Sequence, residues 1–204
     1  GKATALALAR QGASVIIHGR NAAKLAATLA QLREATGNPA LHTVQADFAS
    51  LAETAALAEQ VRLEYPALSV LINNAGLLTD HRQTSVDGFE LTFAVNVLAP
   101  FLLTTRLLDT LKANAPARIV NVASTAMGGG VIDFSNLQVE RRLDEHAQFD
   151  QPVAQRSHFV REGAGKRARS RARSRFGAGV DQVGHGFGLG EVELAVEERP
   201  LREL

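Results

Sequence analysis

The chain has 204 residues, of which 46% are hydrophobic and 21% charged, so it is large and apolar enough for one globular domain with a packed core. Its formal net charge of +1 favours no polyanionic partner overall, and the absence of cysteine excludes disulfides and thiolate metal sites. We expect a cytoplasmic protein without a membrane span, because no uninterrupted apolar run reaches ~18 residues and the amino end shows no cleavable signal pattern.

Helix and strand patterns alternate along the first two thirds of the chain. Helical spacing of apolar residues predicts four helices, and short β-branched or apolar runs predict four strands. In chain order we expect a helix over Lys2–Gln11, a strand over Ser14–His18, a helix from Asn21 to Gly37, a strand over Leu41–Ala46, a helix over Ser50–Tyr65, a strand over Val70–Asn73, a helix over Phe89–Lys112 and a strand over Arg118–Ala123. This alternation predicts an α/β fold, a Rossmann-like doubly wound parallel sheet that is incomplete at its edges.

The composition changes after about residue 146. Residues 147–180 carry eight basic and two acidic groups without any apolar period, which is typical of an irregular or disordered segment. We therefore expect an ordered domain over residues 1–146 and a divergent, poorly ordered tail over residues 147–204. Residues 166–175, KRARSRARSR, lack interleaved aromatic residues, so nucleic-acid binding is the weaker interpretation of their charge. The six histidines show no ligand spacing, and we expect no metal site.

Residues directly after the predicted strands are candidate site residues, because parallel strands present their carboxyl ends at one edge of a sheet. Gly1 opens the first helix, whose free N–H groups suit a pyrophosphate, although it is equally read as a chain end. Arg20 and Asn21 follow the first predicted strand, where an arginine either pairs with a 2′-phosphate or is an ordinary loop residue. Asp47 and Phe48 follow the next strand, and the carboxylate either accepts from an adenine amino group or caps a helix.

The segment Asn73–Gly76, with the sequence NNAG, is the most specific signal. Two carboxamides that leave a buried strand need partners, since an unpaired buried amide costs ~1–3 kcal/mol, and the small Ala-Gly pair lets a flat ring approach the backbone. Asn96 lies inside a predicted helix, where asparagine is a poor helix former, and indicates a bend, a water site or a relay. Ser124 ends the fourth strand, where its hydroxyl either bonds a reacting carbonyl or simply belongs to a turn.

Taken together, these residues resemble the short-chain dehydrogenase/reductase family over about residues 1–151, with the first strand and most of the glycine loop missing before Gly1. The resemblance implies an oxidoreductase that uses NADP, with NAD less favoured, and transfers hydride between nicotinamide and an alcohol or carbonyl substrate. The segment IDFSNLQVERR is similar to the retinol-dehydrogenase-like branch, which implies a lipophilic substrate and allows a homo-oligomer. The resemblance assigns cofactor contacts to Gly1, Arg20, Asn21, Asp47, Phe48, Asn74, Ala75 and Gly76, and catalytic roles to Asn96 and Ser124.

The same resemblance places the family's catalytic tyrosine and lysine at Phe149 and Val153. Phenylalanine can neither donate nor accept a proton, and loss of acid–base catalysis typically lowers a rate ~100- to 10,000-fold. From near residue 150, the alternation of arginine, glycine and serine is typical of a GC-rich coding region read out of frame. We therefore expect impaired activity; the alternatives are a catalytically silent nucleotide-binding remnant and a non-functional truncated or frameshifted product.

Overall fold

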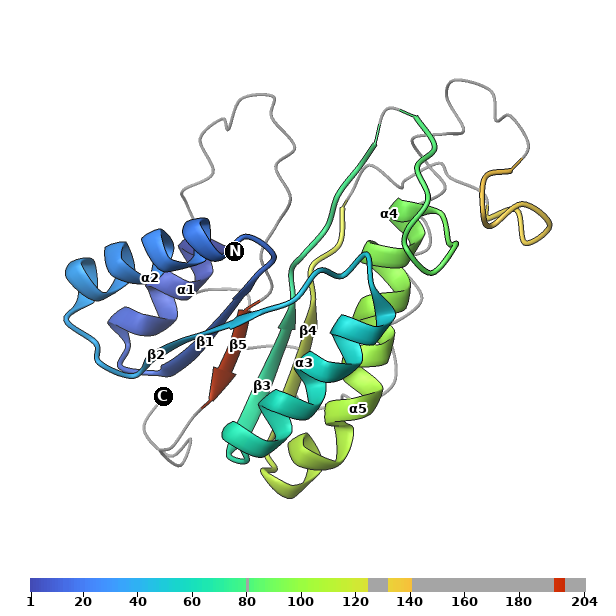
Figure 1. Ribbon diagram of the computed structural model, residues 1–204. Helices are drawn as coiled ribbons and strands as arrows, with labels where there is room; N and C mark the ends of the chain where they lie inside the picture. Colours follow the sequence, from blue (N-terminus) through green and yellow to red (C-terminus); the bar gives the residue numbers. More distant parts are fainter. Residues whose placement is uncertain (80, 125–131, 141–192, 197–204) are drawn as a thin grey trace.

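The computed structural model describes residues 1–79, 81–124 and 132–140, together with the backbone of residues 193–196. Each element that the sequence predicts is present, with bounds that agree to within two residues. In chain order (Figure 1) the elements are α1 Lys2–Arg10, β1 Ser14–Gly19, α2 Ala22–Thr36, β2 Leu41–Gln45, α3 Leu51–Glu64, β3 Leu68–Asn73, α4 Leu91–Phe93, the π-helical segment η1 Ala94–Leu98, α5 Ala99–Ala113, β4 Arg118–Asn121 and β5 Glu193–Val196.

The sheet has five strands in the order β2-β1-β5-β3-β4. Strand β1 pairs in parallel with β2, placing Val15 opposite Leu41, and β3 pairs in parallel with β4, placing Leu71 opposite Ile119. Because β5 is antiparallel to both β1 and β3, those two strands run in the same direction. The predicted Rossmann-like arrangement is therefore confirmed, and β1, β2, β3 and β4 all end at one edge.

Strand β5 differs from the irregular tail that the sequence predicts for this part of the chain. It lies between β1 and β3 (Figure 1), where its backbone pairs with residues 14–17 on one side and with residues 68–72 on the other. Strands in the middle of a sheet need partners for the N–H and C=O groups on both edges, and β5 supplies them to both neighbours. Residues 147–192 and 197–204 of the predicted tail lie outside the described residues.

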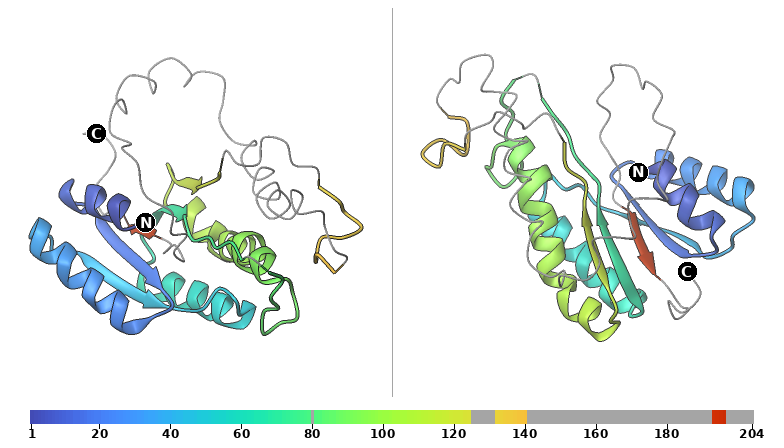
Figure 2. Two further views of the ribbon diagram at one scale, coloured as in Figure 1. Left: turned by 90° about the horizontal axis from the view of Figure 1, so that it is seen from above. Right: turned by 180° about the vertical axis from the view of Figure 1, so that it is seen from behind.

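Helices cover both faces of the sheet. Val15 and Ile17 of β1 pack with Ala5 of α1 and Leu25 of α2 in one core cluster. Ile16, between them in the strand, belongs to a second cluster that is built largely from α3 and α5. Successive strand side chains point to opposite faces, so the unbroken apolar run of β1 serves both clusters. Figure 2 shows α1 with α2 and α3 with α5 on opposite sides of the strands.

Side chains and a glycine define the ends of α2 and the start of α3. The Asn21 carboxamide oxygen accepts from the backbone N–H of Lys24 at 2.9 Å at the start of α2, and Ser50 Oγ accepts from the N–H of Glu53 at 3.2 Å in α3. Gly37 ends α2 in the left-handed region with φ 64°, which a residue with a side chain rarely adopts. These caps place the loops that follow β1 and β2.

The helix predicted over residues 89–112 is divided into three consecutive pieces. Between α4 and α5, the N–H of Ala99 bonds to the carbonyl of Ala94, five residues earlier. Pro100 has no N–H to donate to the carbonyl of Asn96, four residues earlier, which disfavours a regular α-helix at this point. Asn96 lies in the π-helical segment, so the bend that its helix-disfavouring side chain indicates is present.

The run from Leu91 to Ala113 is 23 residues long with a mean hydropathy of 1.6, so by length and composition it could cross a membrane. From the sequence we expect no membrane span, because polar residues such as Asn96 and Arg106 interrupt the apolar character of this run. Inside the protein, Leu103 and Leu107 of this run are fully buried in the core cluster shared with α3 and β3. Packing against the sheet accounts for the apolar character of this helix face.

Strand β4 forms the outer strand of the described sheet on the α5 side. Its pairing within the described residues is with β3, and Ile119, Val120 and nearby Val122 are 39%, 42% and 45% exposed. Apolar side chains on both faces of a strand normally require cover from both sides. Among the described residues, both faces of β4 are thus only partly covered.

Candidate functional site

The predicted site residues follow the carboxyl ends of the four parallel strands. Arg20–Asn21 follows β1, Asp47–Phe48 follows β2, Asn74–Gly76 follows β3 and Ser124 follows β4. The amino end of α1, at Gly1, lies at the same end of the sheet (Figure 1). Parallel α/β sheets bind ligands at this edge. The fold therefore brings together residues that are up to 123 positions apart in the sequence.

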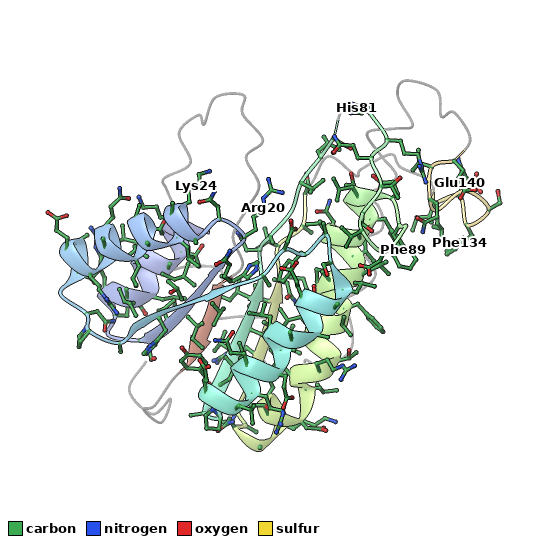
Figure 3. All side chains as sticks on the ribbon, viewed as in Figure 1. Arg20, Lys24, His81, Phe89, Phe134 and Glu140 are labelled. Atoms are coloured by element: carbon green, nitrogen blue, oxygen red, sulfur yellow. The ribbon has the colours of Figure 1, made fainter. Side chains whose placement is uncertain are left out.

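Arg20 presents an exposed positive charge at this edge. Its backbone carbonyl accepts a hydrogen bond from Gln45 Nε2 at 3.1 Å, so the turn after β1 is held to the end of β2. Lys24, in the first turn of α2, is also exposed, and Figure 3 shows both side chains extending from the same end of the sheet. Neither forms an ion pair with a carboxylate in the described part of the chain. Both charges are thus available to an anion, whereas the Asn21 side chain is used as a helix cap.

Asp47 organises the turn between β2 and α3. Its Oδ1 accepts from the N–H of Ala49 at 2.9 Å, and its own N–H donates to Glu53 Oε2 at 2.8 Å. Ser50, rather than Asp47, caps α3. The contact of Asp47 with an adenine stays a prediction. Across residues 1–79, 81–124 and 132–140, no three histidine, aspartate or glutamate side chains gather in a way that could hold a metal ion.

Phe48 and His18 form a buried stack beneath this turn. Both side chains are 4% exposed, and their rings lie 4.2 Å apart between centroids with an interplanar angle of 11°. His18 Nε2 lies 2.9 Å from the carbonyl oxygen of Ala46, so Nε2 carries the proton and donates it. Because the Phe48 ring faces the core, any contact of Phe48 with a ligand falls to its backbone. The sequence did not single out His18.

The NNAG segment leaves β3 with one carboxamide anchored in the interior. Asn73 Nδ2 donates to Asn121 Oδ1 of β4 at 2.8 Å and to Thr104 Oγ1 of α5 at 3.1 Å. Asn73 Nδ2 thus finds the partners expected of a buried carboxamide here, whereas Asn73 Oδ1 is buried and has no hydrogen-bond partner in the described part of the chain. Asn74, the first residue after β3, is half-buried at the carboxyl edge of the sheet and precedes the small Ala75. Asn73 therefore joins two strands and a helix, and Ala75 packs into the core, so Asn74 and Gly76 are the half-buried residues of this segment.

Asn96 closes a two-way hydrogen-bond pair with the loop after the NNAG segment. Its Oδ1 accepts from the N–H of Leu77 at 2.9 Å, and its Nδ2 donates to the carbonyl of Leu77 at 2.7 Å. Asn96 is 8% exposed, and this pair uses both polar atoms of its side chain. The side chain thus holds the loop. The role of Asn96 in a proton relay stays a prediction, and its backbone carbonyl is the group that would take part.

Ser124 is half-buried three residues after β4, at the carboxyl edge. Phe149 and Val153, the positions predicted for the acid–base pair, lie outside the described residues. Tyr65, the one tyrosine of the chain, follows α3 at the opposite edge of the sheet, where its ring lies 5.2 Å from that of His42. Tyr65 is therefore not part of the group of residues around Ser124.

Residues 132–140 contact the loop before α4, which the sequence did not predict. Gln138 accepts from Arg82 Nε through its backbone carbonyl at 2.9 Å and from the N–H of Glu90 through its side chain at 2.7 Å. The buried Glu90 carboxylate in turn caps α4 by accepting from Thr92 and Phe93 N–H groups at 2.8 and 2.6 Å. This segment thereby supports the helix that carries Asn96.

Comparison with known sequences gives one family. A family model described as short chain dehydrogenase matches residues 1–136. Retinol dehydrogenase 13 of Homo sapiens is 42% identical over 142 residues, which are 70% of this chain and 43% of the relative. Retinol dehydrogenase 13 of Mus musculus is 40% identical over 152 residues, which are 74% of this chain and 46% of the relative. The chain spans about half the length of these curated relatives.

Solved structures show the same fold. A putative uncharacterized protein from Mycobacterium paratuberculosis superposes with a TM-score of 0.62 and 30% identity, covering 75% of this chain and 53% of that one. A short-chain dehydrogenase from Sphingobium yanoikuyae in complex with NADPH gives a TM-score of 0.58 at 23% identity, covering 76% of this chain and 57% of that one.

Proposed function

The chain belongs to the short-chain dehydrogenase family, in its retinol-dehydrogenase-like branch, and from this premise we propose that it binds NADP(H) at the carboxyl edge of its sheet. The observation that carries the proposal is the exposed guanidinium of Arg20 at this edge, which has no carboxylate partner among the described residues. A 2′-phosphate supplies the missing negative charge, and arginine binds phosphate oxygens in a planar, bidentate manner. Relatives of this fold include an NADPH complex and an NAD complex, so the preference for NADP rests on Arg20.

The remaining edge residues fit the rest of a dinucleotide. The half-buried Asn74 offers a polar group, and the half-buried Gly76, which has no side chain, would let a flat ring approach the backbone. The amino end of α1, at Gly1, presents N–H groups to a pyrophosphate. Asp47, directly after β2, would accept from the adenine amino group. Together these contacts would align the nucleotide along the ends of β2, β1 and β3.

We further propose an alcohol or carbonyl compound, lipophilic in character, as the substrate. A nicotinamide bound at this edge supplies or accepts a hydride at the substrate carbon. The Ser124 hydroxyl would donate to the substrate oxygen and hold it in place. Asn96 maintains the loop at Leu77 that lines the same edge. The support for this substrate class is the retinol dehydrogenase activity in the names of the relatives.

The turnover rate that we expect depends on proton transfer to or from the substrate oxygen. Tyr65 lies at the opposite edge, and the described residues place no other tyrosine near Ser124. Without a phenol at the substrate oxygen, turnover is expected to be ~100- to 10,000-fold below that of an enzyme with intact acid–base catalysis. The position of Tyr65 also favours the second candidate function, a nucleotide-binding module with no turnover.

Fluorescence titration with NADPH tests nucleotide binding, and an assay with a panel of alcohols and aldehydes then tests turnover. Arg20→Glu should weaken NADPH binding ~10- to 100-fold and change NADH binding little, because one charge-assisted contact contributes ~1.5–3 kcal/mol. Arg10→Glu alters an exposed arginine at the end of α1 and serves as the matched control. Equal losses for both nucleotides in Arg20→Glu would refute the role of Arg20, and binding without turnover would select the second candidate.

A further inference from the structure

His18 touches both neighbours of Asp47. Its Nε2 donates to the carbonyl of Ala46 at 2.9 Å, and its ring stacks on Phe48 with 4.2 Å between centroids. Asp47 lies between these two residues in the sequence and carries the turn bond to Ala49 at 2.9 Å. The end of β1 therefore holds the loop after β2 by one hydrogen bond and one ring contact, on either side of Asp47.

The histidine is in its neutral form. Burial lowers the pKa of His18 from 6.5 to about 4, although the hydrogen bond to Ala46 and the charge of Asp47 act in the opposite direction. Its Nδ1 is buried and has no hydrogen-bond partner in the described part of the chain. A buried acceptor without a donor is destabilising, so the polar contact through which the His18 ring can stabilise the fold is the bond from Nε2 to Ala46. The histidine is thus tied to the loop after β2 by the Nε2 bond and by its ring contact with Phe48.

The same strand end carries the other half of the adenosine site. Arg20 follows His18 by two residues, and its backbone carbonyl is bonded to Gln45 at the end of β2. The relative position of Arg20 and Asp47 therefore depends on how the ends of β1 and β2 are joined. The hydrogen bonds of His18 and Gln45 connect these two ends through side chains.

We infer that His18 is a positioning residue that holds Asp47 and Arg20 at the spacing required by a 2′-phosphorylated adenosine. The inference rests on the proposed function and concerns only the adenosine end of the nucleotide. His18 does not itself touch the ligand, since it is 4% exposed and acts through Ala46 and Phe48. From beneath the site it thereby supports the preference for a 2′-phosphorylated nucleotide.

The test uses His18→Ala, which removes both contacts, and His18→Phe, which retains a ring against Phe48 and removes the donor to Ala46. His18→Ala should raise the Kd for NADPH and the Kd for adenosine 2′,5′-bisphosphate by the same factor, ~10-fold. The variant loses the uncharged hydrogen bond to Ala46 and, with it, the fixed conformation of the loop after β2, which together should weaken binding by about one power of ten. His18→Phe should raise both Kd values ~3-fold without lowering Tm, since it also removes the unpaired Nδ1.

His42→Ala is the matched control, because His42 also contacts an aromatic ring, that of Tyr65, but at the opposite edge of the sheet. It should leave both Kd values unchanged. Hydrogen exchange provides a readout without ligand: the N–H of Ala49, bonded to Asp47, should exchange faster in His18→Ala and not in His42→Ala.

The outcomes separate the two proposals. Wild-type binding of NADPH with unchanged affinity in His18→Ala would overturn the inference and leave the proposed function in place. Equal exchange of the Ala49 amide in the wild type and in His18→Ala would also overturn the inference. No binding of NADPH by the wild type, with a cooperative unfolding transition showing that the chain is folded, would overturn the proposed function and the role of His18 with it.

Discussion

Acidification should destabilise the folded chain through His18. The imidazole is buried and neutral in the fold, with a pKa lowered to about 4 by burial, whereas in the unfolded chain it titrates near 6.5. Between these two values the unfolded chain binds a proton that the folded chain does not. The free energy of unfolding must therefore fall as the pH falls from 6.5 towards 4, and His18 adds no pH dependence above 6.5.

The size of the effect follows from the same two values. A pKa of about 4 in the folded state, against 6.5 in the unfolded state, corresponds to a loss of about 3 kcal/mol once the pH reaches the lower value. The steepest change is ~1.4 kcal/mol per pH unit. Since small domains unfold with ~5–15 kcal/mol, a loss of this size should be plainly visible.

Urea unfolding followed by far-ultraviolet circular dichroism measures this dependence, because the chain has no tryptophan to report by fluorescence. His18→Phe should lose the component of the slope between pH 6.5 and about 4 that the imidazole produces. His42→Phe, the same change at the other edge of the sheet, should retain it. Identical pH profiles for the wild type and His18→Phe would show that His18 is not buried in its neutral form.

Three substitutions test other parts of the structure. Gly37→Ala should cost ~1 kcal/mol of unfolding free energy from backbone strain alone, because φ is 64° and a Cβ meets nothing within 4 Å; an unchanged Tm would contradict the left-handed cap. Asn96→Ala leaves both backbone groups of Leu77 unpaired and should cost ~1–3 kcal/mol with weaker NADPH binding, and full NADPH affinity would argue against its support of the loop. Leu107→Ala empties a fully buried position and should cost ~2–5 kcal/mol by urea unfolding, whereas a loss under 1 kcal/mol would indicate an exposed helix face.

The local elements were predictable because their signals lie within a few residues. Asn21 and Ser50 cap helices with their own side chains, and Gly37 ends a helix in a conformation that favours glycine. The β-branched run of β1 has the length and the uninterrupted apolar character of a strand buried on both faces. Such patterns depend on short-range sterics and hydrogen bonds, which do not require the rest of the chain.

The location of the candidate site was predictable for a related reason. Parallel strands end at one edge, so Arg20, Asp47 and Asn74 had to come together if the alternation of strands and helices was correct. What each side chain does there was not predictable. Asn96 uses both polar atoms of its side chain to bond Leu77, and the ring of Phe48 packs in the core against His18. These partners are distant in the sequence and come close only in the folded chain.

The sequence by itself determined which segments form helices and strands and at which edge of the sheet the polar residues gather. Tertiary structure alone decided the antiparallel strand Glu193–Val196 between β1 and β3 and the neutral histidine at residue 18. A strand of four residues has no local signal strong enough to name its partners, since it pairs with whatever backbone edges distant segments leave open. The pKa of a histidine likewise depends on how much water its neighbours exclude, and those neighbours are brought to it only by folding.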